Sequence, residues 1–368
     1  MSDSASLPTG AAGAPAPPGR VVVPADDLRA FTQQAFKTRG MSHEHAATVA
    51  DALLWANLRG VDTHGVTRVP RYVELIDLGD MNATPAMVVK EVAAGSVSIE
   101  ADRAPGPVAM MRGMNEAIAR ARVAGIGIAV VRATTHTAAL GYYTRHATES
   151  QCLGIAFSGS SPNMAYHGAR AAGVSTSPLS IAAPGGDAQS PIVLDIASGV
   201  VSLGRIAQAR KMKQTLPPGL AIDREGNPTT DPALAWVPLP MAGPKGSGLA
   251  LMIELLSSVL AGNPLLAESL EGTAAGKRHR QNGVCIAIDI ARFIDPAAFA
   301  LEAGRLARDI HALPATDPAE PPMTPGERGD RMMRLRAQTG IPLPPPVAAD
   351  LRALASRLAI PLPAALGV

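Results

Sequence analysis

Short apolar segments closed by glycine or proline recur through the middle of the chain, and they constrain its fold more than any other feature. Each has the length and the bounding residues of a buried strand. They lie at residues 88–92, 97–101, 125–131, 154–158, 179–183, 192–196 and 284–290. Between them, residues 106–124 and 248–261 have the longer apolar pattern of helices. This alternation predicts a mixed α/β core.

The two ends of the chain are predicted to be helical. Residues 24–38 and 42–58 form one pair of helices, in which Pro24 suits a first helical position and Ser42 an N-cap. Residues 328–339 and 347–358 form a second pair near the C-terminus. Residues 1–20 are rich in Ser, Ala, Gly and Pro, which predicts a disordered lead. They lack the basic start of a signal peptide.

Composition excludes several classes of function. The 368 residues are 47% hydrophobic, enough for two joined domains. A net charge of +2 without a dense Lys/Arg run argues against nucleic-acid binding. No window approaches the roughly 20 uninterrupted apolar residues of a membrane span. Cys152 and Cys285 have no metal or redox spacing and predict reduced structural thiols in a cytoplasmic protein.

Polar residues are concentrated at 58–72, directly after an Ala-rich apolar run. Thr63 is a plausible N-cap, which predicts a helix over 63–78 that Pro70 would kink. On such a helix, His64, Arg68 and Tyr72 would share one face.

An imidazole beside a guanidinium suits a particular chemistry. His64 could move a proton while Arg68 holds a carboxylate, which is what a 2-oxo or 2-hydroxy acid requires. A solvated helix start with a structural histidine would contain the same residue types, so this pattern alone does not decide between the two interpretations.

The usual nucleotide-binding and nucleophile motifs are absent from the sequence. No G-x-G-x-x-G follows a predicted strand, residues 243–247 lack the Gly-Lys-Ser/Thr of a P-loop, and no G-x-S-x-G occurs. Taken alone, these absences point away from a nucleotide-dependent enzyme.

A family resemblance reverses that inference. V-D-T-H-G-V-T-R-V-P-R-Y at 61–72 resembles the D-S-H-G-x-x-R-x-x-x-Y signature of the malate/L-lactate dehydrogenase-like oxidoreductases, which are distinct from the Rossmann-type enzymes. Further matching segments follow in the family's order at 136–143, 158–170, 175–178, 193–198, 242–256 and 325–328. The resemblance covers about residues 24–358.

The resemblance implies a fold and an assembly. Residues 87–324 would form a non-Rossmann, mixed-sheet α/β domain that binds NAD or NADP. Residues 21–86 together with 325–368 would form a helical domain that carries His64 and Arg68. Members of the family are typically homodimers, so a homodimer is expected here as well.

The resemblance also implies roles for individual residues. His64 would be the general acid and base, assisted by Thr63, and Arg68 and Thr176 would bind a small carboxylic acid. No metal is expected. Cofactor contacts would come from His136, Thr137, Ala138, Ala139, Leu140, Leu194, Asp195, Ile196, Pro244, Lys245, Gly326, Glu327 and Arg328.

Alternatives remain open from the sequence. Ser175 and Ser177 replace the Gly and Asn of the family's G-T-N-P, which leaves room for a non-catalytic ligand-binding homologue. Arg205 stands where the family's imine reductases tend to carry Asp, which favours an oxo acid over a cyclic imine acid. Asp195 would equally suit a cap for the following helix, and Glu254 needs a buried partner.

Overall fold

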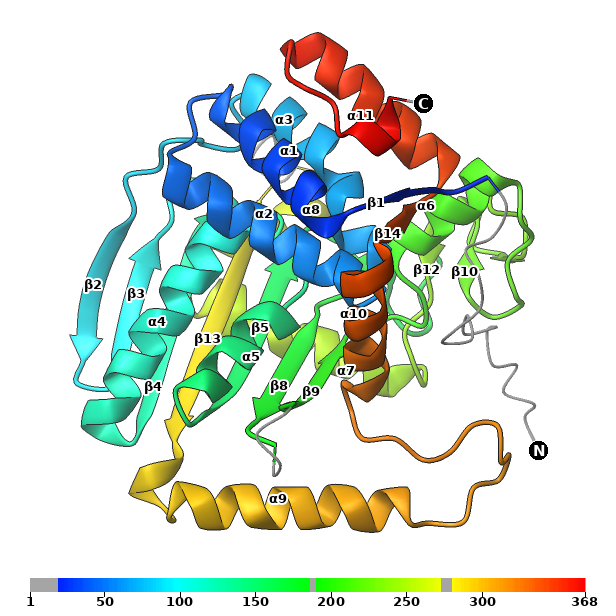
Figure 1. The fold of residues 1–368 in the computed structure, drawn as a ribbon. Helices are drawn as coiled ribbons and strands as arrows, with labels where there is room; N and C mark the ends of the chain where they lie inside the picture. Colours follow the sequence, from blue (N-terminus) through cyan, green and yellow to red (C-terminus); the bar gives the residue numbers. More distant parts are fainter. Residues whose placement is uncertain (1–18, 186–189, 273–279, 368) are drawn as a thin grey trace.

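The computed structural model describes residues 19–185, 190–272 and 280–367 (Figure 1). The predicted disordered lead therefore lies outside the described residues, except for its last two. None of the helices in the described ranges is both long and apolar enough to cross a membrane.

A seven-stranded mixed sheet forms the centre of the molecule, in the order β2-β3-β4-β13-β5-β8-β9. β3 and β4 are parallel, and the other neighbouring strands of the sheet are antiparallel. This mixed sheet confirms the predicted non-Rossmann α/β class. The strands are β2 (Val88–Ala93), β3 (Ser96–Glu100), β4 (Ile126–Thr134), β5 (Cys152–Ser160), β8 (Leu179–Ala183), β9 (Ile192–Ile196) and β13 (Gln281–Asp289).

Helices α4 (Gly106–Ala124) and α5 (Gly141–Glu149) cover one face of this sheet (Figure 1). Small residues bring α4 close to the strands: a Cβ on Gly127 would lie 1.9 Å from the Ala117 carbonyl oxygen. Against β5 lies α7 (Pro244–Glu254), which continues into a π-helical turn (Leu255–Val259) that contacts β4, β5 and β13. The helix predicted at 248–261 therefore begins earlier and changes its pitch before it ends.

Both ends of the chain contribute to a second hydrophobic core, which contains Leu28, Phe36, Leu53, Tyr72 and Leu351. The antiparallel pairing of β1 with β14 joins the two ends directly. This shared core agrees with the predicted helical domain, whose boundaries stay a prediction. The elements are β1 (Val21–Val23), α1 (Ala25–Lys37), α2 (His43–Leu58), α3 (Val69–Asp77), β14 (Ile341–Leu343) and α11 (Pro345–Leu358).

The remaining elements surround the sheet. α9 extends along one edge of the molecule (Figure 1), and of its residues only Gly304 is buried. Residues of α6 and α10 line the two spaces beside residues 62–68 that are described below. The elements are β6 (Met164–Ala165), β7 (Ala172–Val174), α6 (Leu203–Met212), β10 (Ala221–Ile222), β11 (Pro228–Thr229), β12 (Val237–Pro238), α8 (Leu266–Leu270), α9 (Pro296–His311) and α10 (Glu327–Thr339).

The prediction of a helix over residues 63–78 is wrong for the first part of that range. Two short 3₁₀ turns, Asp62–His64 and Val66–Arg68, precede α3, which begins only at Val69. The Asn57 side chain causes the interruption, because its Oδ1 accepts a hydrogen bond from the Val66 N–H at 2.7 Å. It also lies directly against Gly65, where a Cβ would be 2.0 Å from that oxygen.

Two local expectations for this segment change accordingly. The Thr63 side chain does not cap a helix, and its Oγ1 lies instead 3.1 Å from His64 Nδ1. Pro70 lies in the first turn of α3, where proline is tolerated because its missing N–H has no helical partner. It therefore begins the helix rather than kinking one. The N-cap predicted at Ser42 is confirmed, since its side chain accepts a hydrogen bond from the His45 N–H.

Candidate active site

Residues 62–68, which we term the catalytic turn because they contain the predicted catalytic residues Thr63 and His64, are held in place by an ion pair with the other end of the chain. Arg336 on α10 donates to both carboxylate oxygens of Asp62, at 2.6 and 3.1 Å. Asn57 on α2 donates to the same carboxylate at 2.7 Å. Arg336 is buried, so this bidentate pair fixes the turn against two helices. Sequence reasoning missed Arg336, because nothing in the local pattern links α10 to residue 62.

His64 lies against a second histidine. The His64 and His136 rings are stacked, with centroids 5.5 Å apart and planes 25° apart. The Tyr72 hydroxyl lies 2.6 Å from His136 Nδ1 and 3.1 Å from the His136 carbonyl oxygen, so it orients that ring. Burial and, to a lesser extent, the positive charge of Arg68 together lower the pKa of His64 to about 4. The imidazole is therefore neutral near pH 7 and ready to accept a proton.

Arg68 is a half-buried cation that has no counterion among the described residues. Its Nε donates to the Thr63 carbonyl oxygen at 2.6 Å, which leaves the terminal nitrogens to other partners. In the described part of the chain, no carboxylate forms an ion pair with it. Burial lowers the pKa of this guanidinium. A partly desolvated guanidinium without a counterion is unfavourable, so an anionic ligand that binds it would relieve this cost.

A cleft of about 460 Å³ adjoins the catalytic turn on one side. It brings Thr63 and His64 together with seven of the residues predicted to bind the cofactor. These seven are Ala138, Ala139, Leu140, Asp195, Ile196, Gly326 and Arg328. Trp55 and Arg59 of α2 complete much of its wall, and neither was predicted.

The other predicted site residues lie outside the lining of this cleft. Thr137 is buried and donates to the Ser158 hydroxyl at 3.2 Å, and Glu327 accepts a hydrogen bond from the Thr324 N–H at 3.0 Å. Thr176 donates its N–H to the Asn163 side chain at 2.8 Å and is half-buried. Leu194 lies between two lining residues on β9, His136 contacts Tyr72, and Pro244 and Lys245 are exposed in the first turn of α7.

Asp195 caps a helix, but a different helix from the one that follows it. Its Oδ2 accepts a hydrogen bond at 2.8 Å from the N–H of Gly141, the first residue of α5. The following helix, α6, is capped by Ser202 instead. Asp195 borders the cleft and is exposed to it, and desolvation by the protein packed around the carboxyl raises its pKa to about 6 against the opposing effects of Gly141 and Arg59.

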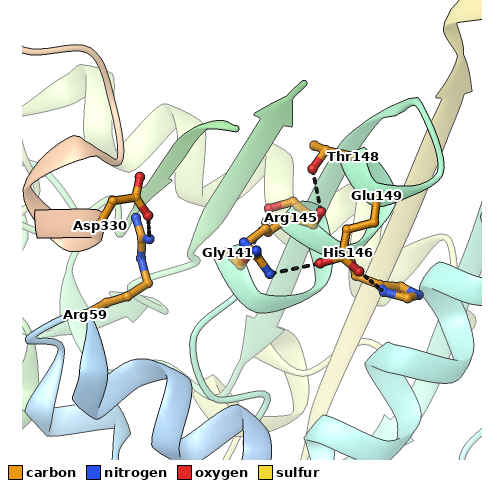
Figure 2. A network of polar contacts seen from close by, with 8 residues as sticks. Arg59, Gly141, Arg145, His146, Thr148, Glu149 and Asp330 are labelled. Atoms are coloured by element: carbon orange, nitrogen blue, oxygen red, sulfur yellow. Dashed lines mark hydrogen bonds and ion pairs between the residues drawn. The ribbon is translucent and has the colours of Figure 1, made fainter. Parts of the chain in front are cut away.

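The floor of the cleft also depends on the C-terminal part of the chain. Arg59 forms an ion pair with Asp330 on α10 (Figure 2) and donates to the Gly326 carbonyl oxygen at 2.8 Å. Its guanidinium also lies 4.9 Å from the centre of the Trp55 ring. Gly329 must lack a side chain here, since a Cβ would be 2.6 Å from the Arg59 guanidinium. The start of α10 is thereby held beside α2.

Glu254 has the buried partners that the sequence required. One of its carboxylate oxygens accepts hydrogen bonds from the N–H groups of Leu265 and Leu266, at 2.9 and 3.1 Å. These bonds hold the start of α8 against α7. Glu254 thus has a structural role and lies outside the cleft.

Comparison with known proteins identifies the family. Residues 23–352 match the sequence profile described as malate/L-lactate dehydrogenase. The chain belongs to this family. Its relatives include the ureidoglycolate dehydrogenase (NAD(+)) of Escherichia coli K12, which is 33% identical over 305 residues, 82% of this chain and 86% of that protein. The prediction of a nicotinamide-dependent oxidoreductase of this family is therefore confirmed.

Solved structures of family members share the whole fold. Malate dehydrogenase from Pyrococcus horikoshii OT3 is 30% identical, with a TM-score of 0.85 over 95% of this chain and 98% of that one. Delta1-piperideine-2-carboxylate reductase from Pseudomonas syringae is 27% identical, with a TM-score of 0.79 over 91% and 99%. The predicted fold is thus confirmed, and the family includes both an oxo-acid enzyme and an imine reductase.

Proposed function

We propose that this chain transfers a hydride between the nicotinamide of NAD or NADP and C2 of a small 2-hydroxy or 2-oxo carboxylic acid. The observation that carries the proposal is the catalytic turn itself. It places a neutral imidazole, His64, four residues from a half-buried guanidinium, Arg68, that lacks a counterion in the described structure. The first group can move a proton and the second can hold a carboxylate.

The residues of the cleft fit a nicotinamide dinucleotide. Ala138 and Ala139 are small and buried, so the backbone of their loop can approach a flat ring closely. Arg328 is an exposed cation on the cleft lining, where a pyrophosphate could meet it. When bound, the cofactor supplies the acceptor or donor of the hydride. Asp195 and Ile196 on β9 would flank it on the opposite wall.

The side chains of the turn account for the proton. In oxidation, His64 accepts the proton of the C2 hydroxyl while Arg68 holds the carboxylate in place. In reduction, the protonated imidazole returns that proton to the C2 oxygen. Thr63, 3.1 Å from His64 Nδ1, holds the ring so that its other nitrogen is available. Thr176 is proposed as a further substrate contact, and Pro244, Lys245 and Glu327 as outer contacts of the cofactor.

The test is the near-ultraviolet absorbance of NADH and NADPH, followed separately. The panel contains pyruvate, oxaloacetate, 2-oxoglutarate, sulfopyruvate and piperideine-2-carboxylate. We expect NADH or NADPH to be oxidised when an oxo acid is present. The His64→Ala variant is expected to bind NADH but to show no turnover. Turnover with the imine alone would instead support the imine reductase, and full activity of His64→Ala would remove His64 from the mechanism.

Binding of NADH can be measured independently of turnover. Trp55 lines the cleft, and the chain contains two tryptophans, so quenching of the fluorescence of Trp55 reports binding there. A Trp236→Phe background removes the second emitter, which stacks with Arg224 elsewhere. Absence of NADH and NADPH binding in the folded protein would contradict the proposal.

We also propose a cytoplasmic homodimer. Exposed apolar side chains recur along α7 and its π-helical turn, at Leu251, Met252, Leu255, Leu256, Val259 and Leu260. An apolar stripe of this kind typically marks a protein interface. Light scattering is expected to give twice the mass of one chain, and Leu256→Glu to give a monomer. The proposed cytoplasmic location rests on Cys152 and Cys285, which are buried free thiols and suit a reducing compartment. Fractionation of cells that express the full chain tests it.

A further inference from the structure

A second cavity lies on the other side of the catalytic turn. Its volume is about 180 Å³, and three segments enclose it: the turn, α6, and the junction of β14 with α11. Thr63 lines both this cavity and the cofactor cleft, so the turn separates the two spaces. His64 lines the cleft, whereas Arg68 lines the cavity. A carboxylate held by the Arg68 guanidinium therefore lies at the edge of this second space, beside Thr63.

One face of α6 forms a wall of the cavity. Gly204, Ala207, Gln208, Lys211 and Met212 recur at the helical spacing of three and four residues, and all five line the cavity. The smallest of them stands nearest the turn: a Cβ on Gly204 would lie 2.9 Å from Thr63 Cβ and 3.4 Å from an Arg68 terminal nitrogen. The cavity is therefore narrow beside Arg68 and is bounded farther along by longer side chains.

The remaining walls are largely apolar. Val66 of the turn lines the cavity, as do Leu343, Val347, Pro342, Pro344 and Pro346 of the C-terminal junction. Among the described residues, the Gln208 amide forms no hydrogen bond, so it is free for a ligand. A chain of methylene groups with a polar end fits this lining better than a short polar molecule does.

Two cations mark the exposed end of the cavity. Arg71 pairs with Glu74 at 2.7 Å and Lys211 pairs with Asp350 at 3.1 Å. All four of these side chains are about half exposed. Exposed pairs of this kind are weak, so a ligand anion can compete for Arg71 and Lys211.

We propose that this cavity takes the substrate's side chain, and that the preferred substrate is a 2-oxo or 2-hydroxy dicarboxylic acid of about six carbons. The inference rests on the proposed function, because Arg68 holds the first carboxylate. Apolar carbons beyond C3 lie against the proline-rich wall, and Arg71 and Lys211 bind the distal carboxylate. At about 30 Å³ for each water-sized group, the volume holds about six non-hydrogen atoms, which are the four carbons and two oxygens beyond C2.

A series of 2-oxo acids tests this proposal. Oxaloacetate, 2-oxoglutarate and 2-oxoadipate differ by one methylene each, pyruvate lacks the distal carboxylate, and 2-oxohexanoate matches 2-oxoadipate without the distal charge. KM is measured with NADH, and Kd by calorimetry on the enzyme with NAD⁺, where no reaction occurs. Each buried methylene is expected to lower both by about fourfold. An affinity that does not rise with chain length would overturn the proposal.

Filling the cavity supplies the structural test. Ala207→Leu is expected to raise KM and Kd for 2-oxoadipate at least ten times more than for pyruvate, because leucine occupies the space of the longer chain. The matched control is Ala353→Leu, an exposed position of α11 outside the cavity, which should change neither constant. Equal effects of Ala207→Leu on the short and the long acid would also contradict the proposal.

The distal charge is tested separately. Arg71→Met and Lys211→Met are each expected to reduce the preference for 2-oxoadipate over 2-oxohexanoate by about fivefold to tenfold, as for one lost hydrogen bond at a half-exposed position. Lys90→Met, an exposed lysine on β2, is the control for lost net charge. Turnover of pyruvate with no preference for longer acids would refute this inference and retain the proposed function. If the enzyme neither turned over nor bound any of these acids, both this inference and the proposed function would be refuted.

Discussion

Arg336 and Asp62 form a bidentate ion pair although 274 positions separate them in the sequence. The arginine also donates to the Asn57 carbonyl oxygen at the end of α2. One side chain from the C-terminal part of the chain therefore holds both the helix before the catalytic turn and the turn itself. The geometry of His64 thus depends on a contact that joins the two ends of the chain.

Removing this pair should affect stability and catalysis together. Arg336→Met leaves the Asp62 carboxylate without its main partner, and breaking a buried pair typically costs about 3–5 kcal/mol of unfolding free energy. Because Asp62 remains partly accessible to water, we expect a value near the lower end of this range. kcat should fall at least tenfold, while NADH affinity changes little. Urea unfolding and steady-state kinetics measure the two effects.

Arg336→Lys is the informative control for that prediction. Lysine keeps the charge but cannot donate to both oxygens in one plane. It should recover most of the stability and only part of kcat if the role of Arg336 is to orient the turn. Wild-type kcat in Arg336→Met would show that the turn holds its geometry without the pair.

The hydroxyl of Tyr72 should matter to catalysis more than to folding. It lies within hydrogen-bonding distance of His136 Nδ1, the ring that stacks on His64. Tyr72→Phe keeps the buried ring but removes the hydrogen bond to the His136 imidazole, at a cost of about 1 kcal/mol in stability. We expect kcat to fall about tenfold. Tyr166→Phe, at an exposed position, is the matched control, and an equal effect of the two would deny Tyr72 this role.

The sequence predicted regular elements well where local pattern decides them. The strands at Leu179–Ala183 and Ile192–Ile196 and the helix at Gly106–Ala124 have the predicted bounds. Apolar residues at a strand or helix period, closed by glycine or proline, are enough to define such elements. The helices α5, α6 and α9 were missed, although the apolar residues of α9 recur at a helical period.

The site was predictable in its residue types but not in its geometry. The family's signature located His64, Thr63 and Arg68, yet the predicted helix through them was wrong. Asn57, a residue on the preceding helix, replaces a helical hydrogen bond at Val66 and forces two tight turns. Such a side-chain contact leaves no periodic signal. The ion pair between Arg59 and Asp330 likewise leaves no periodic signal, because the two residues lie far apart in the sequence.

Gly204 offers a test in which helix propensity and packing act in opposite directions. Alanine is favoured over glycine inside a helix by about 1 kcal/mol, so Gly204→Ala should not destabilise α6. Its Cβ, however, would lie 2.9 Å from Thr63 Cβ and press on the catalytic turn. We expect kcat/KM to fall at least tenfold with an unchanged or raised melting temperature.

A second glycine supplies the matched control for that steric effect. Gly248 lies within α7, and nothing stands within 4 Å of where its Cβ would be. Gly248→Ala should therefore gain the same helix propensity without the contact. If Gly204→Ala and Gly248→Ala have the same activity, α6 does not press on the turn.

The capping carboxylate Asp195 should make stability depend on pH. Its folded pKa of about 6 lies above the ordinary value, so its contribution to stability is complete below the unfolded pKa and is lost as pH rises through about 6. Asp195→Asn keeps an oxygen for the Gly141 N–H but carries no charge. Relative to wild type, this variant should gain melting temperature at pH 8, and the gain should disappear towards pH 4. A difference that is constant from pH 4 to pH 8 would contradict the raised pKa.

The pH dependence of catalysis should identify the proton acceptor. Burial lowers the pKa of His64 to about 4, so the imidazole is unprotonated across the neutral range. In the oxidation direction, kcat/KM should therefore fall as the pH is lowered through about 4. This is well below the pKa of about 6.5 of a free imidazole. Asp195, with a pKa of about 6, could add a second fall in kcat/KM near pH 6. Asp195→Asn should remove this fall and leave the one near pH 4. An acid limb at 6.5 that survives in Asp195→Asn would mean that the imidazole is more solvated than its position beside Arg68 indicates. The same profile in Arg68→Met should show the lower limb moved upward, because removal of the neighbouring positive charge favours the protonated ring.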